Sequence, residues 1–226
     1  ILNALLVFLF FHTLTRGRWL VAGFTALFFA VHPMHVESVA WVSERKDVLY
    51  VFFGLLSLLA YLKYVRSKSL LYFGAALVML VLSCLSKAMA VVLPILFFLI
   101  DYWEGRSLRK IGVWLEKSPF LAVSLFYGLV AMDVQKGGTF HGMFPMLVFQ
   151  NAYTTVFTSV FEKLQYAGYG LMQYCFRLFF PFGLCTYYPY PVTGGPSAAA
   201  VMPGALFFPA YLAATAWCFW RGHRAW

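Results

Sequence analysis

The chain has 226 residues, of which 62% are hydrophobic and only 11% are charged, and its formal net charge is +9. Soluble domains carry about 25% charged residues, so this composition excludes an ordinary soluble domain. It predicts an integral, multi-pass membrane protein whose Lys and Arg residues anchor cytosolic loops, and no nucleic-acid partner is expected.

Long apolar runs predict a series of helices interrupted by short polar segments. The predicted helices cover the run up to Leu14, then Trp19–Val31, Val48–Tyr64, Leu70–Leu85, Ala88–Trp103 with a break at Pro94, Pro119–Met132 and Ala205–Trp220. The second helix is expected to continue with a polar face through His32–Asp47. The segment Glu104–Ser118 is predicted to be a linker, and Asp133–Asn151 a loop rich in Gly.

The first apolar run predicts that the chain is a fragment. Ile1 lies inside this run, which ends at Leu14 and is too short for a full span of about 20 residues. It also lacks the basic start and cleavage site of a signal peptide. We therefore expect a partial transmembrane domain, residues 1–226, truncated at both ends.

The segment Tyr153–Phe180 leaves two layouts open, because it is long and apolar but carries several polar residues. The preferred layout places it at the outer interface, and eleven Lys and Arg residues then fall on one side and six on the other. The richer side is assigned to the cytosol. If the segment instead crosses the membrane, this bias becomes smaller.

His32–Asp47 is the polar centre of the sequence, with two of the five histidines and three of the eight acidic residues. Ionised groups in hydrocarbon cost several kcal/mol each unless they are paired or hydrated. The segment is therefore either a loop facing water on the periplasmic or lumenal side, or a polar site within a helix bundle.

Three cations on the side with fewer positive charges are candidates for binding a phosphate. Arg45 and Lys46 are adjacent, and Lys87 lies between two predicted helices on the same side. Arg offers paired donors to phosphate oxygens, and a nearby Lys adds a point charge. The alternative is that these side chains extend from helix ends toward the headgroups.

Three carboxylates occur in the same segment, and Glu37 is the preferred acid–base candidate. It has no neighbouring cation in the sequence, whereas Glu44 and Asp47 flank Arg45 and Lys46 and could form ion pairs with them. Asp101-Tyr102-Trp103 is interpreted as structural. Asp133 ranks lower as an acid.

The spacing of His32 and His35 is compatible with a metal site, but Pro33 disrupts a shared helical face and no third ligand is set by spacing. Both are assigned polar structural or substrate-contacting roles, and a divalent metal is not expected. The four cysteines form no CxxC pair.

Trp41, Tyr188 and Tyr190 provide aromatic surfaces on which a sugar could stack. The alternative is an interfacial aromatic belt, which is common in membrane proteins. The sequence therefore assigns these three residues a supporting or sugar-contacting role.

Three blocks of the sequence resemble a known family. The first, His32-Pro33-x-His35-x-Glu37-Ser38-Val39-Ala40-Trp41-Val42-x-Glu44-Arg45-Lys46-Asp47-x-Leu49, is similar to bacterial multi-spanning proteins with C-terminal tetratricopeptide repeats. These resemble the transmembrane-and-tetratricopeptide O-mannosyltransferases. The second block comprises Leu85-Ser86-Lys87-Ala88-Met89-Ala90-Val91, Leu93-Pro94 and Asp101-Tyr102-Trp103, and the third is Tyr187-Tyr188-Pro189-Tyr190-Pro191.

This resemblance implies an all-α, GT-C-like helical bundle in the bacterial inner membrane or the endoplasmic reticulum membrane. It implies transfer of a sugar, such as mannose, from a polyprenyl-phosphate donor to a protein or glycan acceptor on the outer face. In such enzymes the general base usually lies in the first outer loop, which would precede Ile1, and a repeat domain would follow Trp226. The fragment alone is therefore expected to be inactive. The rival hypothesis is a non-enzymatic scaffold or transporter with a polar outer loop.

Overall fold

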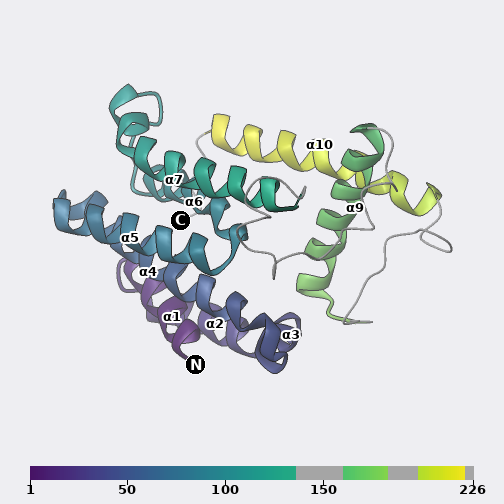
Figure 1. Ribbon diagram of the computed structural model, residues 1–226, viewed down its shortest axis with the longest axis horizontal. Coiled ribbons are helices and arrows are strands. Elements are labelled where there is room, and N and C mark those ends of the chain that lie inside the picture. The colour runs from purple at the N-terminus through teal and green to yellow at the C-terminus, as the bar shows by residue number, and fades with distance from the viewer. Residues whose placement is uncertain (136–159, 183–197, 222–226) are drawn as a thin grey trace. The chain divides into compact units, whose positions relative to one another are not determined.

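The computed structural model describes residues 1–135, 160–182 and 198–221, and every regular element in these ranges is a helix (Figure 1). The chain divides into two compact units, Ile1–Val148 and Phe149–Trp226. The first unit contains α1 (Leu2–Leu14), α2 (Trp19–Val31), α3 (Val36–Ala40), α4 (Arg45–Ser67), α5 (Leu70–Ser86), α6 (Leu93–Trp103) and α7 (Ile111–Gln135). The second contains α9 (Val160–Phe179) and α10 (Ala198–Arg221).

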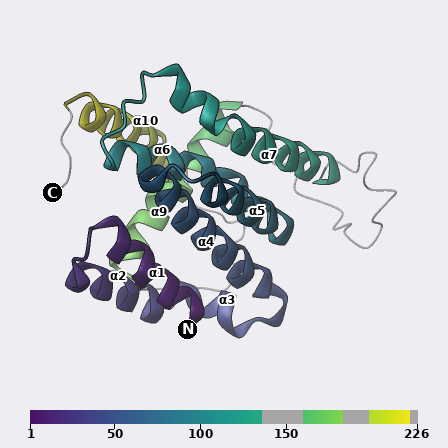
Figure 2. The ribbon, with the colours of Figure 1, turned by 90° about the vertical axis from the view of Figure 1, so that its left-hand side faces the viewer.

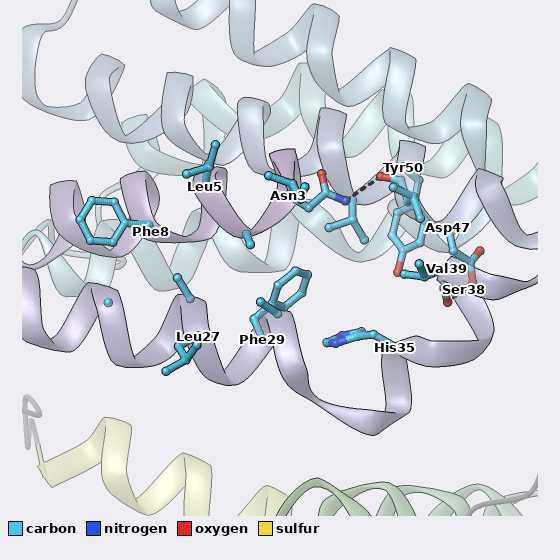
Figure 3. Close-up of a pocket in the computed structure, with 17 residues that line it drawn as sticks. Asn3, Leu5, Phe8, Leu27, Phe29, His35, Ser38, Val39, Asp47 and Tyr50 are labelled. Carbon is cyan, nitrogen blue, oxygen red and sulfur yellow. Dashed lines mark hydrogen bonds between the residues drawn. The ribbon is translucent and has the colours of Figure 1, made fainter.

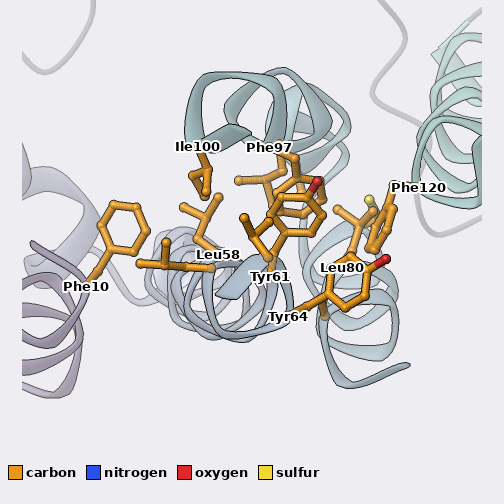
Figure 4. Packing of buried hydrophobic residues seen from close by; sticks show 14 residues of the cluster. Phe10, Leu58, Tyr61, Tyr64, Leu80, Phe97, Ile100 and Phe120 are labelled. Atoms are coloured by element: carbon orange, nitrogen blue, oxygen red, sulfur yellow. The ribbon is translucent and has the colours of Figure 1, made fainter. Parts of the chain in front are cut away.

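The core of the first unit is built around α4 (Figure 4). Tyr61, on this helix, is fully buried, and its ring stacks on that of Phe97 with 4.4 Å between ring centroids. Phe120 of α7 meets both rings edge-on. Aromatic pairs of this kind add to the stabilisation from area burial, so they hold α4, α6 and α7 together.

Small and hydroxylated side chains let the helices around α4 approach closely. A Cβ added at Gly54 would lie 3.2 Å from Leu93 Cδ1, which leaves little room for a larger residue. The hydroxyl of Ser57 donates to the Ala76 carbonyl at 2.6 Å, and that of Ser83 donates to the Tyr50 carbonyl at 2.7 Å. Such contacts are typical of helix packing in membranes. The two serine hydrogen bonds show that α4 and α5 are antiparallel, and Gly54 allows α6 to approach α4.

Contacts at the two ends of α1 show that it runs parallel to α4. Near their starts, Asn3 donates to the Val48 carbonyl at 2.9 Å. Near their ends, Arg66 donates to the Thr13 carbonyl at 2.8 Å and pairs with Glu104 at 2.6 Å. α1 and α2 lie side by side, and α3 lies next to the start of α4 (Figure 2).

The predicted continuation of the second helix through His32–Asp47 is wrong. α2 ends at Val31, and the 3-10 turn Pro33–His35, the short helix α3 and the 3-10 turn Val42–Glu44 follow before α4 begins. Pro33 fixes its own φ and disfavours a helical conformation of the residue before it, and His32 is indeed extended. The helix therefore ends at the proline.

The predicted linker Glu104–Ser118 is also wrong over its second half. α7 begins at Ile111 and contains Pro119, where the helix was expected to start. The polar residues in its first two turns suggested a loop, but the structure buries Lys117 in the core. Pro94 lies in the first turn of α6, after the 3-10 turn Ala88–Val92, where its missing N–H has no intrahelical partner to lose.

Two helices among the described residues are long and apolar enough to cross a membrane, Val42–Ser67 and Ile111–Val134. The bent pair Trp19–Val31 and Pro33–Ala40, with an angle of 52°, would be a third or a re-entrant segment. In its described part the chain is thus all-helical and contains two or three such helices, in agreement with the predicted membrane protein. α9 is not among them, and residues 153–159 of the ambiguous segment lie outside the described part.

Candidate functional site

His32 stabilises the break in the helix after α2. Its Nδ1 accepts a hydrogen bond from the Met34 amide at 3.2 Å, and the side chain is buried. This bond caps the 3-10 turn that follows and satisfies an amide that would otherwise lack a partner. His32 therefore has a structural role at the start of the polar segment.

Lys87 joins three elements at the end of the bundle where α4 begins. Its ammonium forms ion pairs with Asp47 and, at 3.6 Å, with Glu44. Ser38, on α3, donates to the other Asp47 oxygen at 3.3 Å. The sequence placed Lys87 near this segment, and the structure brings them together.

Partial burial lowers the pKa of Lys87, but the hydrogen bond and the charge of Asp47, together with Glu44, outweigh it and raise the pKa above its usual value. The Lys87 ammonium is therefore protonated throughout the physiological range. Its charge is offset by carboxylates of the same cluster.

The three predicted phosphate-binding cations are not equivalent. Lys46 pairs with Glu44 at 3.2 Å, and Lys87 is held by two carboxylates. The Arg45 side chain is exposed and has no hydrogen bond or ion pair within the described ranges. It is thus the cation of this cluster that remains open to an incoming anion.

The other predicted site residues are placed as follows. Glu37 is exposed on α3 and, within the described part of the chain, its carboxylate has no partner. Trp41 is exposed between α3 and the next 3-10 turn. Tyr188 and Tyr190 lie outside the described residues.

A cavity of about 680 Å³ lies between α1, α2, α3 and α4 (Figure 3). Its walls are mainly apolar and include Leu5, Phe8, Leu27, Phe29, Val39, Val48 and Val51. Its polar lining residues are Asn3, His35, Ser38, Asp47 and Tyr50. Figure 3 shows Ser38, Asp47 and Tyr50 close together at one end and Phe8 toward the other.

Two buried polar atoms on residues lining this cavity have no hydrogen-bond partner among the described residues, Asn3 Oδ1 and His35 Nδ1. The amide orientation of Asn3 follows from its bond to the Val48 carbonyl, because only Nδ2 can donate to a carbonyl. Buried polar atoms in folded proteins nearly always have a partner. Both atoms are covered by the surrounding protein, so they are unsatisfied groups of the packing beside the cavity and are not in contact with its interior.

Within the described ranges, no three His, Cys, Asp or Glu side chains are grouped so as to hold a metal ion. The rings of His32 and His35 are 6.0 Å apart and steeply inclined, and Nδ1 of His32 is already used as the cap. The arrangement at the polar segment is therefore one of ion pairs and hydrogen bonds.

A second charged cluster lies in the core of the bundle, near the ends of α4 and α6. Asp101 is fully buried and forms ion pairs with Lys117, which is also fully buried, and with Arg106 at 3.0 Å. The Tyr61 hydroxyl donates to the same carboxylate at 3.1 Å, and Arg106 reaches Glu116 at 2.7 Å. This buried network connects α4, α6, α7 and the turn between the last two.

Sequence reasoning interpreted Asp101 as structural but missed its partner. Asp101 is the one charged residue in the stretch 88–102, and a lone charge in an apolar helix requires a counter-ion. The lone charge of Asp101 therefore predicts a cationic partner but does not show which residue it is. Lys117 was hidden because its neighbourhood was predicted to be a linker.

Three features of the described residues contain the groups relevant to a function: the polar segment, the adjacent cavity and the buried network. No family model, no curated protein and no solved structure matches this chain.

Proposed function

We propose that this chain is a membrane domain that binds a polyprenyl-phosphate sugar and takes part in transferring the sugar to a hydroxyl of a protein or glycan. The observation that carries the proposal is Arg45, an exposed cation without an ion-pair partner in the described ranges, near the start of a helix long enough to cross a membrane. The choice of reaction, transfer of a sugar from a polyprenyl phosphate, comes from the resemblance of the sequence to O-mannosyltransferases.

An anion bound beside Arg45 would be stabilised by its position at the start of α4. The start of a helix carries a partial positive charge, and the two carboxylates there, Glu44 and Asp47, are already paired with Lys46 and Lys87. The first turn of α4 also has no side-chain cap at Glu44. The Arg45 guanidinium at this helix start would attract a phosphate group.

Sugar transfer also requires a base that accepts the proton of the acceptor hydroxyl, and the carboxylates of the polar segment are the candidates. As the bond between the sugar carbon and the phosphate oxygen breaks, the acceptor oxygen bonds to that carbon and loses its proton to a base. Glu37 is exposed and has no partner in the described part of the chain, so its carboxylate is available for this proton. Asp47 is less suited, because Lys87 and Ser38 already bind it.

The proposal is tested by measuring binding of a short-chain polyprenyl phosphate to the chain in phosphatidylcholine nanodiscs. Arg45→Ala is expected to weaken binding at least tenfold, because it removes the available cation. Lys46→Ala should weaken it less, because Glu44 already offsets that charge. Arg109→Ala, which removes another exposed Arg, is the matched control and should leave binding unchanged.

Transfer itself is measured with radiolabelled polyprenyl-phosphate mannose in the longest natural form that contains this chain. Arg45→Ala is expected to abolish transfer while expression stays intact, and Glu37→Gln to reduce it strongly. Unchanged turnover in Arg45→Ala would remove this residue from the mechanism. Unchanged phosphate binding as well would remove the glycosyltransferase proposal.

A transporter remains the second candidate because of the 52° bend between Trp19–Val31 and Pro33–Ala40. Broken helices at a binding site are typical of secondary transporters. The two functions differ in a direct measurement. A transporter would move a labelled solute across proteoliposomes without transferring sugar, and an enzyme would do the opposite.

A further inference from the structure

We propose that two basic turns, at the end of the first unit where α4 ends, form a binding surface for anionic phospholipid headgroups. The basic turns are residues 15–18, between α1 and α2, and residues 67–69, between α4 and α5. The Arg66 guanidinium, at the end of α4, donates to the Thr13 carbonyl at 2.8 Å, so the two turns are neighbours. The proposal is independent of the proposed sugar transfer, which concerns the other end of α4.

Positive charge is concentrated at this end of residues 1–135. Nine of the twelve Lys and Arg residues lie in 15–18, 63–69 and 101–117 together with three carboxylates, which gives these ranges a net charge of +6. The rest of residues 1–135 contains three cations and four carboxylates, a net charge of −1. An anionic surface is therefore attracted to the end of the bundle that carries the basic turns.

The carboxylates at this end leave the basic turns positively charged. Two of the three are held by cations of the buried network. The third, Glu104, pairs with Arg66 at 2.6 Å and less closely, at 3.5 Å, with Arg16, whose side chain is 75% exposed. Arg18 and Lys68 are exposed and form no ion pair with any described residue.

Two lysines beside these cations are held in place without losing their charge. Lys63 Nζ lies 5.6 Å from the centroid of the Tyr72 ring, and Lys68 Nζ lies 5.3 Å from that of Tyr64. A tyrosine ring attracts an ammonium group but carries no net charge. Both ammonium groups therefore add to the positive surface at the end of α4.

The backbone at Arg16 and Lys68 disfavours a side chain at each position. Both residues have φ of 56°, and among the described residues they are the two that have positive φ without being glycine. In this left-handed region Cβ crowds the neighbouring carbonyl, so glycine fits better. The end of a helix attracts cations, but a cation on an adjacent residue with relaxed φ would serve it equally well. A charged partner outside the bundle explains why both strained positions carry a cation.

Two tryptophans indicate that the basic turns lie at the depth of lipid headgroups. Trp19 directly follows Arg18 and is 66% exposed, and Trp103 donates from Nε1 to the Leu14 carbonyl, at the end of α1, at 3.1 Å. Trp is enriched at the membrane interface, and α1 and α2 contain no Lys, Arg, Asp or Glu. The phosphate of a phospholipid lies at this depth, so the surface fits a lipid headgroup better than a nucleic acid.

The test is photo-crosslinking with a phosphatidylglycerol that carries a diazirine near its headgroup, using the full chain in phosphatidylcholine nanodiscs. We expect crosslinked peptides from residues 13–20 and 63–72, and unlabelled phosphatidylglycerol should compete with the probe. A phosphatidylcholine probe of the same design should crosslink these peptides at least tenfold less. Equal yields from the two probes would overturn the proposal, and so would displacement of the anionic probe by inorganic phosphate or by an oligonucleotide.

Arg16→Gly combined with Lys68→Gly separates lipid binding from folding. Each cation near an anionic membrane surface contributes a factor of about five to binding, so the yield from the anionic probe should fall at least tenfold. Because glycine fits the positive φ, Tm should stay the same or rise. Arg16→Lys combined with Lys68→Arg is the matched control, since it keeps both charges and should keep the yield. An unchanged yield in the glycine variant, or a loss in the control, would contradict the proposal.

Arg18→Gln tests the same surface at a residue with relaxed φ, −72°, and does not depend on how the glycine variant folds. The yield from the phosphatidylglycerol probe should fall several-fold. Raising the NaCl concentration should reduce the preference of the wild type for the anionic probe, because exposed charges are screened by salt. A preference that neither the substitution nor salt changes would show that these cations do not bind the headgroup.

Discussion

The carboxylate of Asp101 and the ammonium of Lys117 form an ion pair in which neither side chain is exposed to solvent. Asp101 is on α6 and Lys117 is two turns into α7, so the pair fixes the contact between these helices. Burying two charges is unfavourable unless further hydrogen bonds satisfy them. Tyr61 and Arg106 supply those bonds to the carboxylate.

Removing one member of this pair should destabilise the bundle more than removing both. Asp101→Leu leaves Lys117 buried without its counter-ion, which costs about 3–5 kcal/mol. Asp101→Leu combined with Lys117→Met should recover part of this loss, although Arg106 still loses one of its two partners. The measurement is the free energy of unfolding in detergent, as a double-mutant cycle.

The exposed Lys110 is the control for that cycle. Lys110→Met removes a Lys from the same region and should leave unfolding unchanged. If Asp101→Leu unfolds like the wild type, or if the double variant shows purely additive losses, the pair does not stabilise the fold as the structure indicates.

Lys87 should make the stability of the bundle sensitive to strongly alkaline pH. Asp47 and Glu44 raise its pKa above the usual 10.5, so its ion pairs contribute stability below that pH and lose it as the pH rises through the raised pKa. The difference in Tm between wild type and Lys87→Gln should be constant from pH 6 to 9 and shrink only above about 10.5. A difference that disappears near neutral pH would contradict the pairing.

Gly204 should be essential for the packing of α10 on α9. A Cβ at this position would lie 2.7 Å from Tyr169 Cβ and closer still to the Tyr169 backbone. Gly204→Ala should therefore separate the two helices and increase hydrogen exchange in residues 164–179. Gly170→Ala is the control, because its Cβ meets nothing within 4 Å and Ala favours the helix. Equal exchange in both variants would refute the close contact.

The two ends of α4 should be accessible from opposite sides of the membrane. Ser43 and Ser67 are exposed and lie at the two ends of the helix Val42–Ser67, which is long enough to cross. In a variant without native cysteines, we expect Ser43→Cys to react with a membrane-impermeant maleimide added to the non-cytosolic side, and Ser67→Cys to react from the cytosol. Labelling of both from one side would reject a crossing by α4.

The sequence predicted most helices well where long apolar runs are separated by charged turns. α5 matches the predicted helix to within one residue, and α2 matches it at both ends. It also marked His32–Asp47 as the polar centre and placed Lys87 beside it. These predictions succeed because the membrane requires apolar spans and self-satisfied backbones, and both requirements are visible in local composition.

By itself, the sequence thus determined the helical class, the presence of helices apolar enough to cross a membrane, and the candidate polar residues. The tertiary structure decided which charges are paired. It neutralised Lys46 and Lys87, left Arg45 available, and buried Lys117 against Asp101. It also brought Asn3 and His35 to one cavity, although 32 positions separate them. The physical reason is that ion pairs and cavities depend on which helix faces meet, and that depends on packing between residues far apart in the chain.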